Sequence, residues 1–251
     1  MAGTTGEILL RRRDLDTLAW AAEQYAARTD QLSVLLGCGP RTVQRLLARL
    51  RQARLVDVRR VLAGEPSWVI PTARGLRACG SSFGAWRPRL GLLSHVAAVN
   101  DVRLHIQARS PDSEWVCERV LARERESQRE HLPDAIVLTD ERRVAIEVEL
   151  TVKSRRRLTT ILDELTGRYD AVLYFCAPAS RRVLSELSQT GRWPTLGVRE
   201  LPVSRPGFDG GLVSRFSRSF GGRVLPCFSQ RRVLRSLVVD GPRALRVDAR
   251  C

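Results

Sequence analysis

Residues 131–153 read HLPDAIVLTDERRVAIEVELTVK, and this stretch decides the fold. Over residues 143–153 every even-numbered position is apolar, whereas every odd-numbered position is polar apart from Ala145. Alternation of period two predicts a β-strand over residues 143–153 with one buried face and one exposed face. A shorter apolar run over residues 135–138 ends in a polar turn. The two runs together predict a hairpin.

Three carboxylates of this hairpin are expected to converge on one face. Glu147 and Glu149 fall on the exposed face of the predicted strand, about 7 Å apart by strand rise, and the hairpin brings Asp134 alongside them. Such carboxylates repel one another unless a cation or protons neutralise them, so the pattern predicts oxygen ligation of Mg²⁺ or Mn²⁺. An ion of this kind polarises a phosphodiester and generates hydroxide.

Lysine is used once in this chain, at position 153, beside 41 arginines. Because a guanidinium does not replace a compact ammonium everywhere, this bias indicates that Lys153 was chosen for its chemistry. On the strand it follows Glu149 by four residues. Its charge would there stabilise a transition state or hold an attacking water.

The patterns on either side of the hairpin predict a mixed α/β domain. The expected order is helix, three-stranded meander, helix and strand. Outside the hairpin, these elements are expected over residues 90–109 (helix), 115–121 (strand), 156–166 (helix) and 171–177 (strand).

The first part of the chain predicts a helix-turn-helix followed by a two-stranded wing. Thr29 is the expected N-cap of the second helix, and Thr72 begins the helix that closes the domain. The expected helices cover residues 12–27, 29–36 and 41–52, and the strands 55–62 and 67–71. This layout is typical of proteins that bind double-stranded DNA. The candidate DNA-binding residues are Arg41, Thr42, Gln44, Arg45, Arg49, Arg51, Arg59 and Arg60.

Charge favours the same partner. The 251-residue chain has a net charge of +15, of which residues 1–87 carry +7, residues 88–205 carry +2 and residues 206–251 carry +6. A basic chain of this kind favours a polyanion such as nucleic acid. The longest apolar runs fall well short of the roughly 20 residues that span a bilayer, and the start of the chain lacks a signal-peptide core. We therefore expect a cytoplasmic protein associated with the nucleoid or a plasmid, without a membrane partner.

The hairpin motif resembles a known metal site. Asp134 follows Pro133, and after twelve intervening residues come Glu147, Val148 and Glu149, a pattern similar to that of the PD-(D/E)xK nuclease superfamily. With the amino-terminal winged helix and the stretches AVNDVRL, HLPDA and AIEVELTVK, the chain resembles the replication-relaxation family of actinobacterial plasmids and other mobile elements. The similarity covers roughly residues 10–200.

The resemblance implies a winged helix-turn-helix over residues 1–87 and a restriction-endonuclease-like mixed-sheet domain over residues 88–205. The basic C-terminal extension, residues 206–251, is not covered. The activity that the resemblance implies for the protein is hydrolytic nicking or cleavage of DNA with a divalent metal, in plasmid replication or transfer.

The resemblance also assigns roles to single residues. Asp134 and Glu147 match the metal-binding positions, while Glu149 stands where most members of the superfamily have the catalytic lysine. Lys153 lies about 13 Å further along an unbroken strand, so only a break in the strand or an approach from the following helix would bring its ammonium back. Asp101, with Asn100, is a candidate for an auxiliary metal-binding position, and His131 for contact with the scissile phosphate or a metal-bound water.

Other interpretations stay open from the sequence alone. The glutamates could be solvated and paired with Arg142, Arg143 or Arg155, which would be nearly neutral in energy. The protein could be a non-catalytic regulator of plasmid replication or transfer with an inactive nuclease fold, an interpretation that Glu149 at the lysine position favours. The first part could instead be a helical module that recruits a protein partner. A homodimer is compatible with each of these interpretations.

Overall fold

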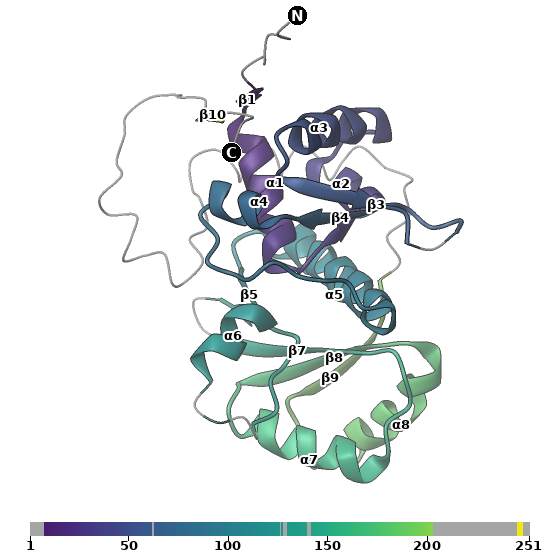
Figure 1. The fold of residues 1–251 in the computed structure, drawn as a ribbon. Coiled ribbons are helices and arrows are strands. Elements are labelled where there is room, and N and C mark those ends of the chain that lie inside the picture. The colour runs from purple at the N-terminus through teal and green to yellow at the C-terminus, as the bar shows by residue number, and fades with distance from the viewer. Residues whose placement is uncertain are drawn as a thin grey trace, which may run out of the picture. The chain divides into compact units, whose positions relative to one another are not determined.

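The fold is mixed α/β (Figure 1). The computed structural model describes residues 8–61, 63–125, 127, 130–139, 142–202 and 245–247. These residues fall into two compact units, of which the first contains residues 8–97 with 245–247 and the second contains residues 98–202. Nearly all of the expected C-terminal extension, residues 206–251, lies outside the described residues. Within the described part, no helix combines the length and the apolar character needed to cross a bilayer.

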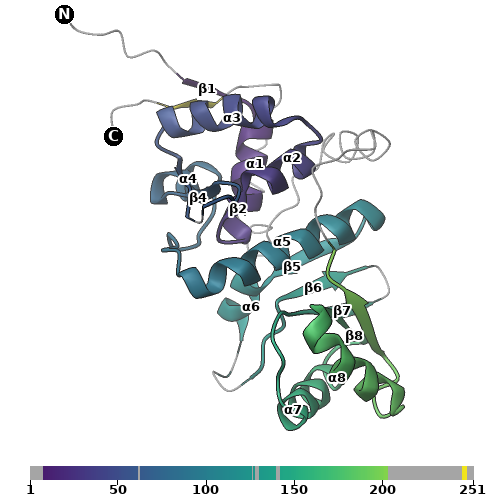
Figure 2. The same ribbon diagram turned by 90° about the vertical axis from the view of Figure 1, so that its right-hand side faces the viewer.

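The first unit combines helices with a small antiparallel sheet (Figures 1 and 2). Its elements are β1 (Ile8–Leu10), α1 (Arg12–Glu23), β2 (Ala27–Arg28), α2 (Thr29–Leu36), α3 (Pro40–Gln52), β3 (Val56–Arg59), β4 (Trp68–Pro71), α4 (Ala73–Ala78) and the first part of α5 (Leu90–Arg109). The sheet has the order β2-β4-β3, and β1 pairs separately with β10 (Leu245–Val247). The expected three helices and two strands are therefore present.

Local chemistry explains where these helices begin and end. Gly37, with a φ of 56°, ends α2 in the left-handed conformation, and Pro40 occupies the first turn of α3. Two expected boundaries are wrong. The first helix ends at Glu23 because Tyr25 adopts a positive φ of 67°, which interrupts the helical path. Thr29 is the first residue of α2 and not its N-cap.

The second unit is built on a five-stranded sheet of order β5-β6-β7-β8-β9. Its elements after α5 are β5 (Glu114–Cys117), α6 (Glu118–Glu124), β6 (Ala135–Leu138), β7 (Arg143–Glu149), α7 (Arg155–Thr166), β8 (Ala171–Cys176), α8 (Pro178–Gln189) and β9 (Leu196–Glu200). Strands β5, β6 and β7 form an antiparallel meander, whereas β8 and β9 continue the sheet in parallel. This is the expected order of elements, extended by α8 and β9. The strand expected over residues 115–121 is wrong in its second half, where the chain turns into α6.

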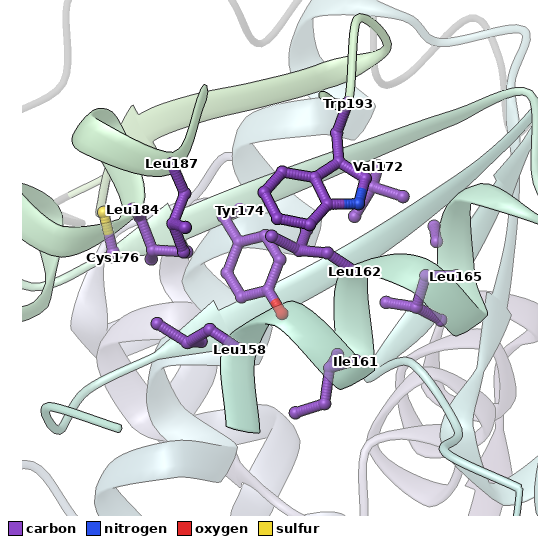
Figure 3. Packing of buried hydrophobic residues seen from close by; sticks show 11 residues of the cluster. Leu158, Ile161, Leu162, Leu165, Val172, Tyr174, Cys176, Leu184, Leu187 and Trp193 are labelled. Carbon is purple, nitrogen blue, oxygen red and sulfur yellow. The ribbon is translucent and has the colours of Figure 1, made fainter. Parts of the chain in front are cut away.

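Helices α7 and α8 cover one face of this sheet (Figures 1 and 2). Figure 3 shows the core that results, in which Tyr174 and Val172 of β8 meet leucines from both helices. The other face of β8 carries Phe175, whose ring contacts His105 of α5 edge-on at 6.0 Å. Strand β7 thus lies in the middle of a sheet that is covered on both sides, and this position determines the environment of its glutamates.

A close approach in the first unit gives a test of its packing. Gly75 lies in α4, and an added Cβ would overlap the carbonyl oxygen of Leu55. We expect Gly75→Ala to lower the free energy of unfolding by about 1–3 kcal/mol, because backbone on both sides has to move. Gly91→Ala is the matched control, since a Cβ there meets open space in α5 and helix propensity favours alanine. Urea midpoints followed by tryptophan fluorescence check both variants, and equal midpoints would contradict the packing.

Candidate functional site

Three carboxylates lie at the carboxyl end of β7. Glu147 and Glu149 follow Ala145 on the face that α7 and α8 cover, and their residues are 4% and 3% exposed. Asp134 directly precedes β6, whose first residue pairs with Ile146, and its Oδ2 accepts a 2.7 Å hydrogen bond from Val148 N. The expectation that the two glutamates occupy an exposed face is therefore wrong. A central strand flanked by β6 and β8 and covered by helices has no solvated face.

Glu147 shares a contact with a histidine. His131 Nε2 lies 2.9 Å from Glu147 Oε1. Burial raises the pKa of Glu147 from 4.5 to about 7, with a further increase from the charge of Asp134, while His131 and Lys153 act in the opposite direction. A carboxyl group with this pKa changes protonation near neutral pH, which is the range in which a general acid or base is effective.

Glu149 is paired with the single lysine. Strand β7 ends at Glu149 instead of continuing to residue 153, and the turn that follows brings Lys153 Nζ to 2.5 Å from Glu149 Oε2. The backbone N–H and the hydroxyl of Thr151 both donate to Glu149 Oε1 at 3.3 Å. The strand expected over residues 143–153 is thus too long. A break in the strand was one of the two ways in which Lys153 could come back to the carboxylates, and it is the one that occurs here.

Tyr174 is a member of the site that the sequence analysis missed. It is the register partner of Glu147 across β7 and β8, it is fully buried, and its hydroxyl has no hydrogen-bond partner among the described residues. Burial and the charges of Glu147, Glu149 and Asp134 raise its pKa, so the phenol stays protonated. In Figure 3 its ring packs beside Leu158 of α7. A parallel register set by a crossover helix leaves no local signal that pairs a tyrosine with a distant glutamate.

His131 is held in place through its backbone. Its N–H donates to Glu164 Oε2 at 3.1 Å, and its carbonyl oxygen accepts from Arg168 Nη2 at 2.5 Å. The residue also lines an open cleft of about 340 Å³ next to the first turns of α7. The histidine therefore connects the buried Glu147 with a cleft that solvent reaches.

The expected metal ligands do not form a ready-made coordination shell. Among the described residues, no group of three or more His, Cys, Asp or Glu side chains is arranged to hold a metal ion. Each carboxylate instead has a polar partner of its own: Val148 N, His131 or Lys153. Asp101 and Asn100 lie in α5 and belong to no such group in the described residues. The donor chemistry suits Mg²⁺ or Mn²⁺, but occupancy requires these side chains to rearrange.

The alternative in which the glutamates are solvated and paired with arginines is also wrong. Both glutamates are buried, and Arg155 pairs with Glu186 of α8 at 2.6 Å. The Arg143 guanidinium lies over the ring of Tyr169, 5.4 Å from its centre.

The candidate DNA-binding residues of the first unit fall into two groups. Arg41, Gln44, Arg45 and Arg51 are exposed on α3, on the side opposite its buried leucines, and Arg60 follows β3. Thr42 accepts from Arg45 at 3.4 Å. Two others have carboxylate partners: Arg49 reaches the buried Asp14 at 2.8 Å, and Arg59 pairs with the exposed Asp57. Arg49 thus ties α3 to α1, and its availability to a ligand is reduced accordingly.

An open groove of about 440 Å³ runs along one side of α3. Gln44 and Arg51 line it from the helix, and Val58 and Ser67 line it from the β3 and β4 hairpin. The exposed face of α3 is therefore bordered by the hairpin.

Comparison of the chain with protein-family models, curated proteins and solved structures found no match. The motif resemblance stays a prediction.

The raised pKa of Glu147 predicts how stability depends on pH. In the fold this carboxyl stays protonated up to about pH 7, whereas in the unfolded chain it ionises near 4.5, so unfolding releases a proton between these values. The free energy of unfolding should therefore fall as the pH rises from 5 to 8, by up to about 3 kcal/mol. Glu147→Gln should flatten this dependence in urea titrations with EDTA. Glu186→Gln, which changes an exposed carboxylate, should leave it as in the wild type; an equal slope in both variants would contradict the assignment.

Proposed function

We propose that this protein is a DNA-binding endonuclease of a mobile element that nicks or cleaves DNA with Mg²⁺ or Mn²⁺ in plasmid replication or transfer. The observation that carries the proposal is the arrangement at the end of β7, where the Lys153 ammonium meets the buried Glu149 beside Glu147 and Asp134. Clustered, perturbed ionisable groups at the carboxyl edge of parallel strands favour a functional role.

Lysine placement supports the nuclease proposal. In the PD-(D/E)xK pattern, Glu149 takes the usual lysine position, which by itself favours an inactive fold. Here the chain turns after Glu149, and Lys153 reaches the same neighbourhood from four residues later. The ammonium also acts on Glu147, since it lowers the pKa of that carboxyl. A positive charge is therefore available next to the carboxylates, as a developing negative charge on phosphate requires.

Asp134 and Glu147 are the residues that we propose for metal binding. A bound Mg²⁺ or Mn²⁺ would polarise the phosphodiester and lower the pKa of a water. For this, Glu147 has to lose its proton and its contact with His131. Its pKa of about 7 makes that loss inexpensive at neutral pH, and the released histidine is then free to bind or protonate an oxygen at the cleft.

The first unit supports recognition of double-stranded DNA by a winged helix. Helix α2, the turn at Gly37, helix α3 and the hairpin of β3 and β4 follow one another in the order of that motif. The basic face of α3 is exposed, whereas its apolar face is buried. A helix of this kind reads base edges and phosphates.

Nicking of supercoiled plasmid with Mg²⁺ or Mn²⁺, followed on agarose gels, tests the activity. We expect Lys153→Met to reduce the rate by about a hundredfold, by loss of charge stabilisation, and Asp134→Asn and Glu147→Gln to reduce it at least as much. Glu186→Gln is the matched control and should nick like the wild type. If nicking survives in all three site variants, it arises elsewhere in the preparation or the chain.

DNA binding by α3 has a separate test. We expect Arg45→Ala to weaken binding of a DNA duplex in EDTA by roughly tenfold, as for loss of one base or phosphate contact. Arg12→Ala removes another exposed arginine, from α1, where it pairs with Asp16 at 2.9 Å, and should bind like the wild type. Fluorescence anisotropy measures both, and equal losses would show that only overall charge matters.

A specific observation also favours a non-catalytic regulator. The acidic cluster is already balanced without a metal, because Lys153 pairs with Glu149 and His131 contacts Glu147. In this second candidate the nuclease-like unit would be a DNA-binding scaffold. Calorimetric titration with Mn²⁺ separates the two candidates, since the nuclease binds the ion and loses binding in Asp134→Asn, whereas the regulator binds none.

A further inference from the structure

The open cleft beside α7 has a lining that is cationic. Its walls are His131, Ser154, Arg156, Arg157, Thr160 and Ile161, so it contains two arginines and a histidine but no carboxylate. Its volume of about 340 Å³ corresponds to roughly ten water molecules. That space is sufficient for a phosphate with an attached sugar.

Arg156 and Arg157 differ from the other arginines around them. The arginines around them, on α7, on α8 and in the loop after α8, have carboxylate partners. Arg155 and Arg182 pair with Glu186, Arg181 pairs with Glu200, and Arg192 pairs with Asp163. Arg156 and Arg157 are exposed and form no ion pair with any described residue. Because neither guanidinium group has a carboxylate partner among the described residues, an anion in the cleft gains a favourable interaction without having to break an existing ion pair.

His131, which shares the lining with the two arginines, is tied to α7 and the turn after it through its backbone. Glu164 and Arg168 of α7 and its following turn bind the backbone of His131 on both sides, through its N–H and its carbonyl oxygen. His131 lines the cleft, and its Nε2 lies 2.9 Å from Glu147 Oε1. The cleft is thereby adjacent to the buried carboxylates through a single side chain.

We propose that this cleft binds a backbone phosphate of nucleic acid, with Arg156 and Arg157 as its principal ligands. Guanidinium groups bind phosphate oxygens through paired, charge-assisted hydrogen bonds. The inference rests on the proposed function, because it makes the phosphodiester next to Glu147 the substrate group. It assigns to the two arginines a role in positioning the strand, which is distinct from the chemistry at Asp134, Glu147 and Lys153.

The test compares two double variants of the full chain that each lose two positive charges. Arg156→Ala/Arg157→Ala removes the cleft arginines, and Arg181→Ala/Arg182→Ala removes two adjacent arginines of α8 that already pair with carboxylates. Binding of a fluorescein-labelled duplex is measured by anisotropy in EDTA across a salt series. For the cleft variant we expect the slope of log K against log salt to be smaller by about 0.9, since losing the contact with one phosphate removes about 0.9. The α8 variant should keep the wild-type slope.

Further arms separate the outcomes. Arg156→Gln/Arg157→Gln keeps the side-chain bulk and should reproduce the effect if charge is the cause, and circular dichroism verifies folding. A change in slope in EDTA supports the cleft even where no nicking is seen with Mg²⁺. Conversely, nicking by the wild type together with an unchanged slope in the cleft variants overturns the cleft and leaves the nuclease proposal standing. The cleft proposal is also overturned if the cleft and α8 variants have equal slopes. It is overturned as well if polyglutamate displaces the DNA as effectively as inorganic phosphate does at equal charge.

Discussion

Two glutamates lie on the covered face of the central strand β7, and the residues around them have to compensate their negative charges. An isolated carboxylate in such a place is strongly unfavourable, so each one has to be paired, hydrogen-bonded or protonated. All three solutions occur at the end of β7. Lys153 pairs with Glu149, Val148 N donates to Asp134, and Glu147 keeps a proton to near neutral pH.

This requirement explains the course of the chain after β7. If the strand continued, Lys153 would be carried away from Glu149, and the buried carboxylate would lose its cation. The chain instead leaves the sheet at residue 150, returns the lysine and enters α7 with Ser154 as the N-cap. The same turn places the exposed arginines of α7 beside His131, so the buried acids and the cationic cleft arise from one short segment.

Much of this fold can be predicted from periodicity. Helix α3 and the pairing of β6 with β7 follow from apolar spacing and turn residues, because those signals are local. The environment of Glu147 does not follow, since alternation in one strand is the same whether its polar face meets water or helices. The polar residues of β7 look like a solvated face, but α7, α8 and Tyr174 cover it, and those contacts are made across a parallel crossover.

The candidate site shows the same limit. Its acidic members are recognisable because Asp134, Glu147 and Glu149 lie within one hairpin, and Lys153 stands out by composition alone. The other members are not recognisable, because each depends on residues that meet only after α7 has packed on the sheet. They are Tyr174, the hydrogen bonds that hold the His131 backbone, and the arginines of the cleft. Arg49 is a case of the opposite kind, in which a residue with a suitable position on α3 is engaged by a buried aspartate from another helix.

The pairing of β1 with β10 has a consequence for dissecting the protein. Residues 8–10 and 245–247 belong to the same unit, although the whole second unit lies between them along the chain. The first unit is therefore discontinuous, and no single cut releases both units intact. A fragment that stops after β9 leaves β1 as an unpaired edge with Leu9 exposed, which invites intermolecular strand addition. Circular permutation, which joins the two ends and opens the chain elsewhere, keeps that pair together.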